Sequence, residues 1–258
     1  MTASPATIDL NADLGEGFGP WRMGDDAALL RIVTSANVAC GFHAGDPDIM
    51  SGVLSQARES GVAVGAHVAF PDLAGFGRRL LPMSPAEIAR AVAYQIGAAQ
   101  ALAVLAGHRL THVKAHGALA NLAEQDAAVA DAIAGAARAV DPSLILLAIA
   151  RSEQTRAGAR AGLRVAHEIF ADRAYADDGR LAPRASPGAV IHDSEAAIAR
   201  VRRMLAAQAL ITMSGKTLPT PIDSICVHGD TPQAVALAQA LRAALTADGV
   251  ALKPFVTR

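Results

Sequence analysis

Short apolar runs rich in β-branched residues alternate along the chain with longer alanine-rich stretches. The runs predict strands at 6–10, 32–39, 62–67, 110–116, 144–149, 164–170 and 224–228. The stretches between them predict helices, and several carry a recognisable N-terminal signal. These signals are Asp46-Pro47, the capping box Ser84-Pro85-Ala86-Glu87, the start of a helix at Asp193-Ser194 or Ser194-Glu195 that runs to Gln208, and Thr231-Pro232. Residues 210–228 depart from this alternation and predict a hairpin that leads into the last strand.

The regular strand–helix alternation predicts an α/β fold with a parallel sheet and helical crossovers. No low-complexity linker interrupts residues 1–258, so we expect a single domain. About seven strand–helix units in this length favour a closed (β/α) barrel over an open sheet.

Polar residues occupy one face of three predicted strands. Period-two alternation places three groups of residues on such faces: Asp9, Asn11 and Asp13; His112, Lys114 and His116; Cys226, His228 and Asp230. Helices outside a barrel need the apolar faces, so the polar faces are expected to point into the lumen or its mouth. Buried charges there must be paired or bound to a ligand.

Composition excludes several classes of protein. The chain has 258 residues, of which 52% are hydrophobic, and its formal net charge is -1. A disordered chain and a nucleic-acid-binding protein are therefore not expected. The most apolar stretch, 86–107, is interrupted by Glu87, Arg90 and Gln95, so no membrane span is predicted. The start lacks the features of a signal peptide, and Cys40 and Cys226 show no paired spacing, which predicts a cytoplasmic protein with reduced thiols.

Glycine-punctuated polar loops follow nearly every predicted strand, and they contain four of the eight histidines. These are His43, His67, His116 and His228, and we expect them to converge with Asp13, Glu16, Asp46 and Asp230 at the carboxyl ends of the strands. One use of the cluster is a divalent metal bound by Asp13, His43 and His67. The alternative is that the histidines act as hydrogen-bond donors and general acids without a metal.

Several cations are candidates for anion binding. Lys114 is suited to neutralise a phosphate or polarise a carbonyl, and its alternative role is a structural ion pair with Asp9 or Asp13. Arg78, Arg79 and Arg173 are weaker candidates. Phenylalanines 18, 42, 70, 76 and 170 lie in or beside the loops, as pocket walls or as loop anchors. The sequence Ser214-Gly215-Lys216-Thr217 is not a phosphate loop, since Leu210 replaces the required glycine.

Seven motifs in chain order resemble the LamB/YcsF family, whose members form the A component of 5-oxoprolinase. They are IDLNADLGEGFG, TSANVACGFHAGDP, GAHVAFPDLAGFGRR, YQIGA, HVKAHGALAN, EIFADRAY and ICVHGDTP, from Ile8 to about Thr231. The sequence departs from the family pattern HVKPHGALYN, because Ala115 replaces the proline and Ala120 the tyrosine. The residues after His67 also differ from the usual proline-containing form.

The resemblance implies an irregular (β/α) barrel similar to polysaccharide deacetylases. It also implies ATP-dependent hydrolysis of the lactam of 5-oxo-L-proline to L-glutamate, together with partner subunits B and C. In that reaction Lys114, Arg79 and Arg173 would meet the phosphates, and Asp13 or Glu16 would hold Mg²⁺. A histidine among His43, His67, His116 and His228, with Asp230 nearby, would serve as the base.

Two other functions fit the same residues. The first is a metal-dependent deacetylase or amidohydrolase that needs no ATP. The second is a non-catalytic subunit that binds substrate and positions its partners.

Overall fold

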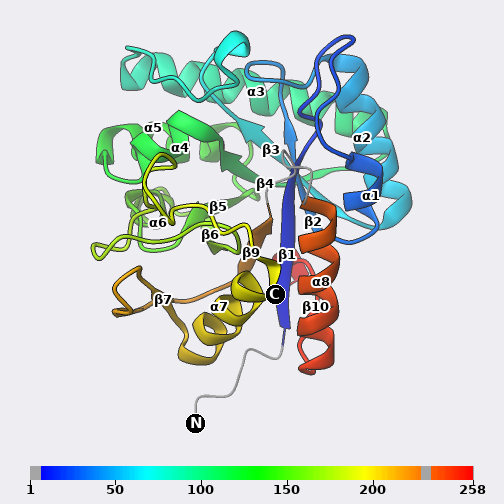
Figure 1. The fold of residues 1–258 in the computed structure, drawn as a ribbon. Coiled ribbons are helices and arrows are strands. Elements are labelled where there is room, and N and C mark those ends of the chain that lie inside the picture. The colour runs from blue at the N-terminus through cyan, green and yellow to red at the C-terminus, as the bar shows by residue number, and fades with distance from the viewer. Residues whose placement is uncertain (1–6, 228–233, 258) are drawn as a thin grey trace.

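The computed structural model describes residues 7–227 and 234–257 (Figure 1). Within these residues, seven parallel strands form a closed barrel in the order β1-β2-β3-β4-β5-β6-β9, since β9 pairs with both β6 and β1. The strands are β1 (Thr7–Leu14), β2 (Ser35–Ala39), β3 (Ala63–Val68), β4 (Leu110–Ala115), β5 (Ile145–Ile149), β6 (Arg164–Phe170) and β9 (Ser224–Val227). The predicted α/β barrel is confirmed.

Helices connect successive strands and surround the barrel (Figure 1). They are α1 (Asp26–Leu30), α2 (Pro47–Ser60), α3 (Pro85–Leu105), α4 (Gly117–Ala123), α5 (Ala127–Val140), α6 (Glu153–Arg160), α7 (Ser194–Ala207) and α8 (Ala234–Ala247). Asp46 caps α2, and Ser84 and Glu87 form the predicted capping box of α3. Asp193 caps α7, which ends at Ala207, one residue before the predicted end, with Gln208 as its C-cap. Thr231 and Pro232 lie outside the described residues.

Short elements complete the fold. The strands β7 (Ala209–Ile211) and β8 (Thr217–Pro219) form an antiparallel hairpin, which confirms the hairpin predicted before the last strand. The strand β10 (Ala251–Leu252) pairs with the first residues of β1. Two 3₁₀ turns, η1 (Leu73–Gly75) and η2 (Phe255–Thr257), lie after β3 and near the end of the chain.

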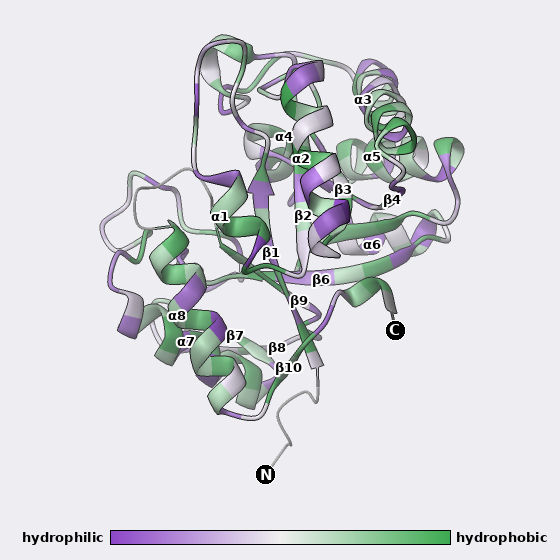
Figure 2. Ribbon diagram, turned by 90° about the vertical axis from the view of Figure 1, so that its right-hand side faces the viewer, coloured by the Kyte–Doolittle hydropathy of each residue, from purple (hydrophilic) through white to green (hydrophobic). Residues whose placement is uncertain are grey.

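The two faces of the barrel wall differ in chemistry, as the alternation predicted. In β1, Ile8, Leu10 and Leu14 are fully buried in the hydrophobic core. Residues of the opposite face, such as Asp9 and Asn11, are also fully buried, and they bond to polar groups of other strands. Figure 2 shows hydrophilic and hydrophobic residues on the same surrounding helices, as expected for helices with one covered face.

An apolar plug fills part of the lumen below the polar residues. Phe255 from η2 packs with Ile145, Leu147 and Ala166 in a small buried cluster. Its ring also contacts the ring of His112, with centroids 5.1 Å apart. The lumen accepts His112 because residue 65 of β3 is glycine, where a Cβ atom would lie 2.2 Å from that imidazole.

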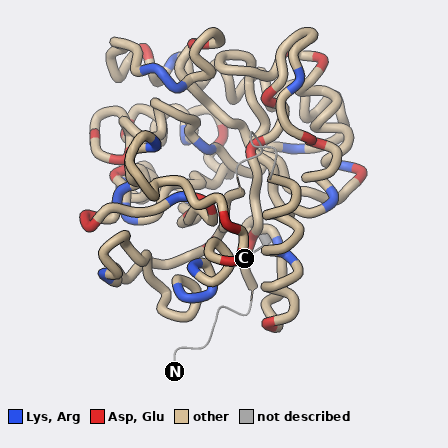
Figure 3. Tube along the Cα trace, in the orientation of Figure 1, with Lys and Arg blue, Asp and Glu red and all other residues tan. Residues whose placement is uncertain are grey.

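Helix α3 has the length and apolar content of a membrane-crossing helix. It packs against α5 and α2 in this fold, and its Gln95 side chain is buried and bonds the backbone of Ala69. Basic and acidic residues are interspersed along the whole trace (Figure 3). The expectation of no nucleic-acid partner stays a prediction.

Candidate active site

Among the polar residues of β1 that face the lumen, Asp9 lies farthest from the barrel mouth, near the N-terminal end of the strand. Its carboxylate accepts hydrogen bonds from Thr34 and Ser35, each at 2.6 Å, and from Ser224. Burial raises the pKa of Asp9 to about 6, although the three hydroxyl groups favour the ionised form. These partners come from the β1–β2 region and from β9, so Asp9 ties neighbouring strands together. It is not the partner of Lys114.

A layer of amide groups lies above Asp9. Asn11 donates to Glu168 Oε1 at 3.0 Å, and Asn37 donates to Asn11 Oδ1 at 2.8 Å and to Asp13 Oδ1 at 2.9 Å. His112 Nε2 lies 3.0 Å from Asn37 Oδ1. Burial, with the Lys114 charge nearby, lowers the pKa of His112 to about 3, so its imidazole stays neutral. These amide groups hold the carboxylates of Asp13 and Glu168 in position, and both carboxylates contact Lys114.

Lys114 bridges two carboxylates at the floor of the site. Its Nζ atom lies 2.9 Å from Asp13 Oδ1, 2.9 Å from Glu168 Oε1 and 3.2 Å from Cys226 Sγ. Burial disfavours the ammonium ion, but the surrounding groups, with Asp13 and Glu168 among them, hold the pKa of Lys114 well above its usual value. The predicted ion pair with Asp13 is therefore present, and Glu168 joins it.

Three histidines and a glutamate meet at the mouth of the barrel. They are Glu16, His43, His67 and His116, which come from the loop after β1, the loop after β2, strand β3 and the N-cap of α4 directly after β4. One ligand atom from each lies within 4.8 Å of the others. His116 Nδ1 is 3.1 Å from His67 Nε2 and 3.6 Å from Glu16 Oε1. The ring of His43 stacks on His116, with centroids 3.9 Å apart.

The donor set of this cluster fits a divalent transition-metal ion. His116 Nε2 contacts the Phe76 carbonyl oxygen at 2.8 Å, and His67 Nδ1 contacts the Lys114 carbonyl oxygen at 3.3 Å. Each contact leaves the other ring nitrogen facing the cluster, as in histidines that bind metals. Among the described residues, neither ring nitrogen of buried His43 has a hydrogen-bond partner. Such an orphan acceptor is costly unless something binds it.

The charge state of these histidines suits the same role. Burial lowers the pKa of His116 to about 3, and burial together with His116 and His67 holds the pKa of His43 well below its usual value. Both rings are therefore neutral near pH 7, and neutral imidazole is the form that binds a metal.

The predicted metal ligands are placed as follows. His43 and His67 belong to the cluster, and Asp13 lies beside it, with Oδ2 3.3 Å from His67 Nε2. The other oxygen of Asp13 accepts from Lys114 and Asn37. Glu16 and His116 complete the four-residue set, so the carboxylate of the set is that of Glu16. Metal binding itself stays a prediction.

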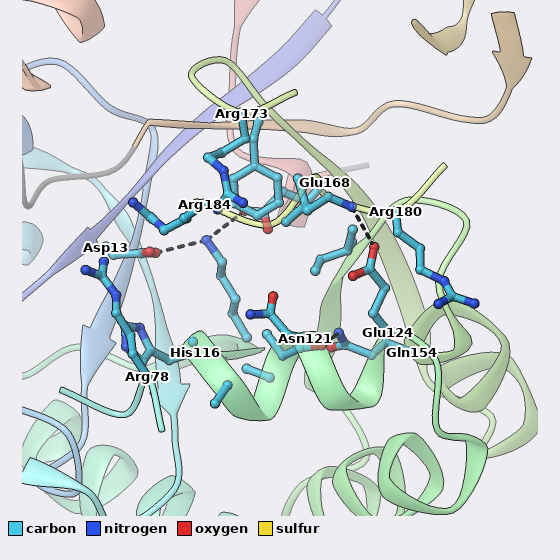
Figure 4. A pocket seen from close by; sticks show the side chains of 18 of the residues that line it. Asp13, Arg78, His116, Asn121, Glu124, Gln154, Glu168, Arg173, Arg180 and Arg184 are labelled. Atoms are coloured by element: carbon cyan, nitrogen blue, oxygen red, sulfur yellow. Dashed lines mark hydrogen bonds and ion pairs between the residues drawn. The ribbon is translucent and has the colours of Figure 1, made fainter. Parts of the chain in front are cut away.

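A cavity of about 600 Å³ opens above Lys114 and His116 (Figure 4). Its size falls in the range of small-molecule sites. Its walls carry Arg78, Arg173, Arg180 and Arg184 together with polar residues that sequence reasoning missed, Asn121, Glu124, Gln154 and Glu168. Ala115 and Ala120, the two departures from the family pattern, also line it. Burial raises the pKa of Glu124 to about 7.

Other predicted site residues lie elsewhere. Arg79 forms an ion pair with buried Asp72, and it is not among the residues that line the cavity. Asp46 accepts from the backbone of Gly19, Asp48 and Ile49 as the cap of α2, so it does not join the histidines. Of the five loop phenylalanines, Phe170 lines the cavity, and Phe76 packs on His43 and His116. His228 and Asp230 lie outside the described residues.

Glu168 was within reach of sequence reasoning. In RVAHEIF, alternation places Ala166, Glu168 and Phe170 on one face, and β6 was predicted with the correct bounds. A charged glutamate on the lumen face of a strand is as unusual as Lys114 on the lumen face of β4, and it could have been singled out for the same reason. Asn121 and Glu124 lie on α4 and just after it, where periodicity gave no indication of a cavity.

Comparison with known proteins agrees with this architecture. The chain is 58% identical over 253 residues to the A component of the 5-oxoprolinase of Gluconobacter oxydans (strain 621H), covering 98% of this chain and 99% of the relative. The crystal structure of a lactam utilization protein from Thermus thermophilus superposes with a TM-score of 0.90 at 43% identity, covering 96% and 99% of the two chains.

A more distant likeness concerns the fold alone. The catalytic domain of a peptidoglycan N-acetylglucosamine deacetylase from Eubacterium rectale ATCC 33656 matches with a TM-score of 0.51 at 12% identity, covering 98% of this chain and 90% of that one. The barrel thus has the same overall fold as that deacetylase domain. Residues 8–258 match the LamB/YcsF family, and the chain belongs to that family.

Proposed function

We propose that the chain is the A component of a multi-subunit 5-oxoprolinase, which hydrolyses the lactam of 5-oxo-L-proline to L-glutamate while ATP is hydrolysed to ADP and phosphate. The observation that carries the proposal is the buried Lys114, held between Asp13 and Glu168 beside Glu16 and three histidines at the floor of a cavity. The full-length identity to a protein named as the A component of a 5-oxoprolinase supports the choice of substrate.

The reaction requires activation of a resonance-stabilised amide. Transfer of the γ-phosphoryl group of ATP to the amide oxygen releases ADP and makes the ring carbon electrophilic. Water adds to that carbon, the C–N bond breaks to release the amine, and a second water hydrolyses the resulting acyl phosphate to the carboxylate and phosphate. Negative charge develops on the phosphoryl group and on the oxygen of the tetrahedral adduct, and a preorganised cation stabilises it at low reorganisation cost. Lys114 is such a cation, since two carboxylates and burial fix its ammonium group in one place.

Glu168 supplies a second contact with the lactam. Its Oε1 atom binds Lys114 and Asn11, whereas its buried Oε2 atom has no hydrogen-bond partner among the described residues. Glu168 also lines the cavity. A buried carboxylate oxygen without a donor is costly, so Oε2 is suited to accept the lactam N–H. This contact would turn the carbonyl toward Lys114.

Glu16, His43, His67 and His116 are the residues that would hold a metal ion. When bound, a divalent ion supplies a nucleophilic water at neutral pH and polarises a carbonyl. Independently of the ion, His43 is buried, and its two ring nitrogens have no hydrogen-bond partner within the described part of the chain, so its neutral ring is suited to accept a hydrogen bond from the attacking water. The Phe76 and Lys114 carbonyl oxygens hold the rings of His116 and His67 in position.

ATP and partner subunits belong to the same proposal. The sequence contains no phosphate loop, so ATP turnover is expected with partner subunits B and C rather than with the chain alone. Lys114 in the cavity would meet the phosphates, and Asp13 or Glu16 would bind Mg²⁺. Arg79, which pairs with Asp72, would contribute only if that ion pair opened. The proposed setting is the cytoplasm, where ATP is available and free Cys40 and Cys226 stay reduced.

Reconstitution tests the function. The chain mixed with subunits B and C should release glutamate and phosphate from 5-oxo-L-proline and ATP in equal amounts, and each of the three proteins alone should release far less. Glutamate that forms at the same rate without ATP would instead support a metal-dependent amidohydrolase, which the cluster of Glu16 and three histidines favours. Full activity after substitution of both Lys114 and His43 would support a non-catalytic substrate-binding role.

A further inference from the structure

One wall of the cavity contains a buried arginine. Arg173, in the loop after β6, is 7% exposed and lines the cavity (Figure 4). Its Nη2 atom donates to the Ala182 carbonyl oxygen at 2.7 Å, but its buried Nε atom has no hydrogen-bond partner among the described residues. A guanidinium donor without an acceptor is costly to bury. This wall of the cavity therefore carries a cationic side chain whose hydrogen-bonding capacity is not filled within the described residues.

Further arginines surround this position. Arg184 and Arg78 line the same cavity, and both act electrostatically on Arg173. Burial and then the Arg184 charge lower the pKa of Arg173, and the neighbouring Asp172 offsets this only in part. Like charges gathered at a cavity wall repel one another until an anion binds between them.

The other cations of the cavity have closer partners. Lys114 lies 2.9 Å from each of two carboxylates. Arg180 is exposed, and it bonds Gln125 and pairs with Asp178. Arg173 is thus the buried cation of the cavity best placed to take an anionic group of a ligand.

We propose that Arg173, with Arg184 and Arg78 around it, binds the carboxylate of a carboxylated lactam, and thereby selects such substrates over neutral lactams. This inference rests on the proposed function, because it concerns the same cavity and substrate. The planar guanidinium matches a carboxylate with two parallel hydrogen bonds. When Arg173 binds the carboxylate, the amide group of the lactam ring can contact Lys114 and Glu168. A neutral lactam would leave the buried Nε atom unpaired, and the site would reject it.

The test compares two substrates in the reconstituted three-subunit enzyme. These are 5-oxo-L-proline and 2-pyrrolidinone, the same ring without the carboxylate. Arg173→Met should lower kcat/KM for 5-oxo-L-proline about 10–10²-fold, mainly through KM, because a hydrogen bond to a charged group is lost. It should leave kcat/KM for 2-pyrrolidinone unchanged. Arg173→Lys should recover only part of the loss, and the matched surface variant Arg202→Met should behave as wild type.

Equal losses for both substrates in Arg173→Met would assign Arg173 a structural role and overturn the proposal. The proposal would also be overturned if Arg173→Met kept the wild-type preference for 5-oxo-L-proline over 2-pyrrolidinone but was no longer inhibited by inorganic phosphate, because Arg173 would then bind a phosphoryl group. Calorimetric binding of 5-oxo-L-proline to the full chain separates this inference from the proposed function. If wild type binds 5-oxo-L-proline and Arg173→Met does not, but the wild-type complex shows no turnover, the carboxylate site stands and the proposed function is rejected. If wild type and Arg173→Met turn over 5-oxo-L-proline equally well, the proposed function stands and the carboxylate site is rejected.

Discussion

Lys114 Nζ on β4 lies 2.9 Å from Glu168 Oε1 on β6, although strand β5 separates the two strands in the barrel wall. With Asp13 on β1 as the third member, the ion-pair network spans the lumen. It joins three strands that are distant in sequence, and it forms the floor of the candidate active site.

Replacing Lys114 should therefore affect both stability and activity. Lys114→Met removes the cation between two buried carboxylates, which should lower the free energy of unfolding by about 3–5 kcal/mol. It should also lower turnover about 10²–10³-fold per folded molecule, because a preorganised charge is lost. Thermal unfolding and kcat, both measured well below the melting temperature of the variant, separate the two effects. Lys216→Met, on the exposed hairpin, is the control. If the folded fraction of Lys114→Met had a near-normal kcat, Lys114 would have a structural role only.

The cluster of Glu16, His43, His67 and His116 should bind one divalent ion per chain. His43→Ala removes one of four donors and should weaken zinc or manganese binding by at least about 10–100-fold. That is the loss typically seen when a residue that only hydrogen-bonds to a metal ligand is replaced, and loss of a ligand itself should cost no less. Metal content by elemental analysis and affinity by calorimetry provide the measurement without any assay of activity. His167→Ala is the matched control, since His167 contacts Asp223 and lies outside the cluster. Equal metal content in wild type and His43→Ala would contradict the site.

Glu124 should make stability depend on pH. Burial raises its pKa from 4.5 to about 7 in the folded state, so folding favours the protonated carboxyl. This contribution is complete below pH 4.5 and is lost as pH rises through 7. Glu124→Gln imitates the protonated form, so its stability relative to wild type should increase by about 3 kcal/mol between pH 4 and pH 8. Urea unfolding of both proteins across this range measures the difference. A constant difference would show that Glu124 titrates normally.

Ala120 lines the cavity at a position where the family pattern has tyrosine. Ala120→Tyr should add an aromatic wall that contacts a small ring, lowering KM for 5-oxo-L-proline by up to about tenfold with little change in kcat. Steady-state kinetics of the reconstituted enzyme tests this, and Ala120→Phe shows whether the hydroxyl group contributes. A raised KM in both variants would mean that the cavity needs the space that alanine leaves.

Sequence periodicity was sufficient to predict the barrel and the polar character of its lumen. Strand β6 was predicted with its observed bounds, and the hairpin before β9 was recognised as a break in the alternation. The prediction succeeded because each strand has one face covered by helices, and period-two alternation records which face that is. The same alternation placed Asp13, Lys114 and His116 on the lumen side.

Alternation gives the face of a residue but not its partner across the lumen. The sequence offered Asp9 or Asp13 for Lys114, and the barrel register places Asp13 and Glu168 beside it, while Asp9 bonds hydroxyl groups one layer below. Likewise, Asp46 resembled a member of the histidine cluster, but it caps α2.

The sequence by itself determined the strands, the helix caps and the set of polar residues available to the lumen. Only the tertiary structure decided which of the residues expected to converge make up the cluster, with Glu16 and His116 in it and Asp46 outside it. It also decided that Arg173 lies buried in the cavity wall and that Arg79 pairs with Asp72 away from the cavity. The physical reason is that local periodicity and capping depend on neighbours within a few residues, whereas distances across a closed barrel depend on strand register and on the course of each loop.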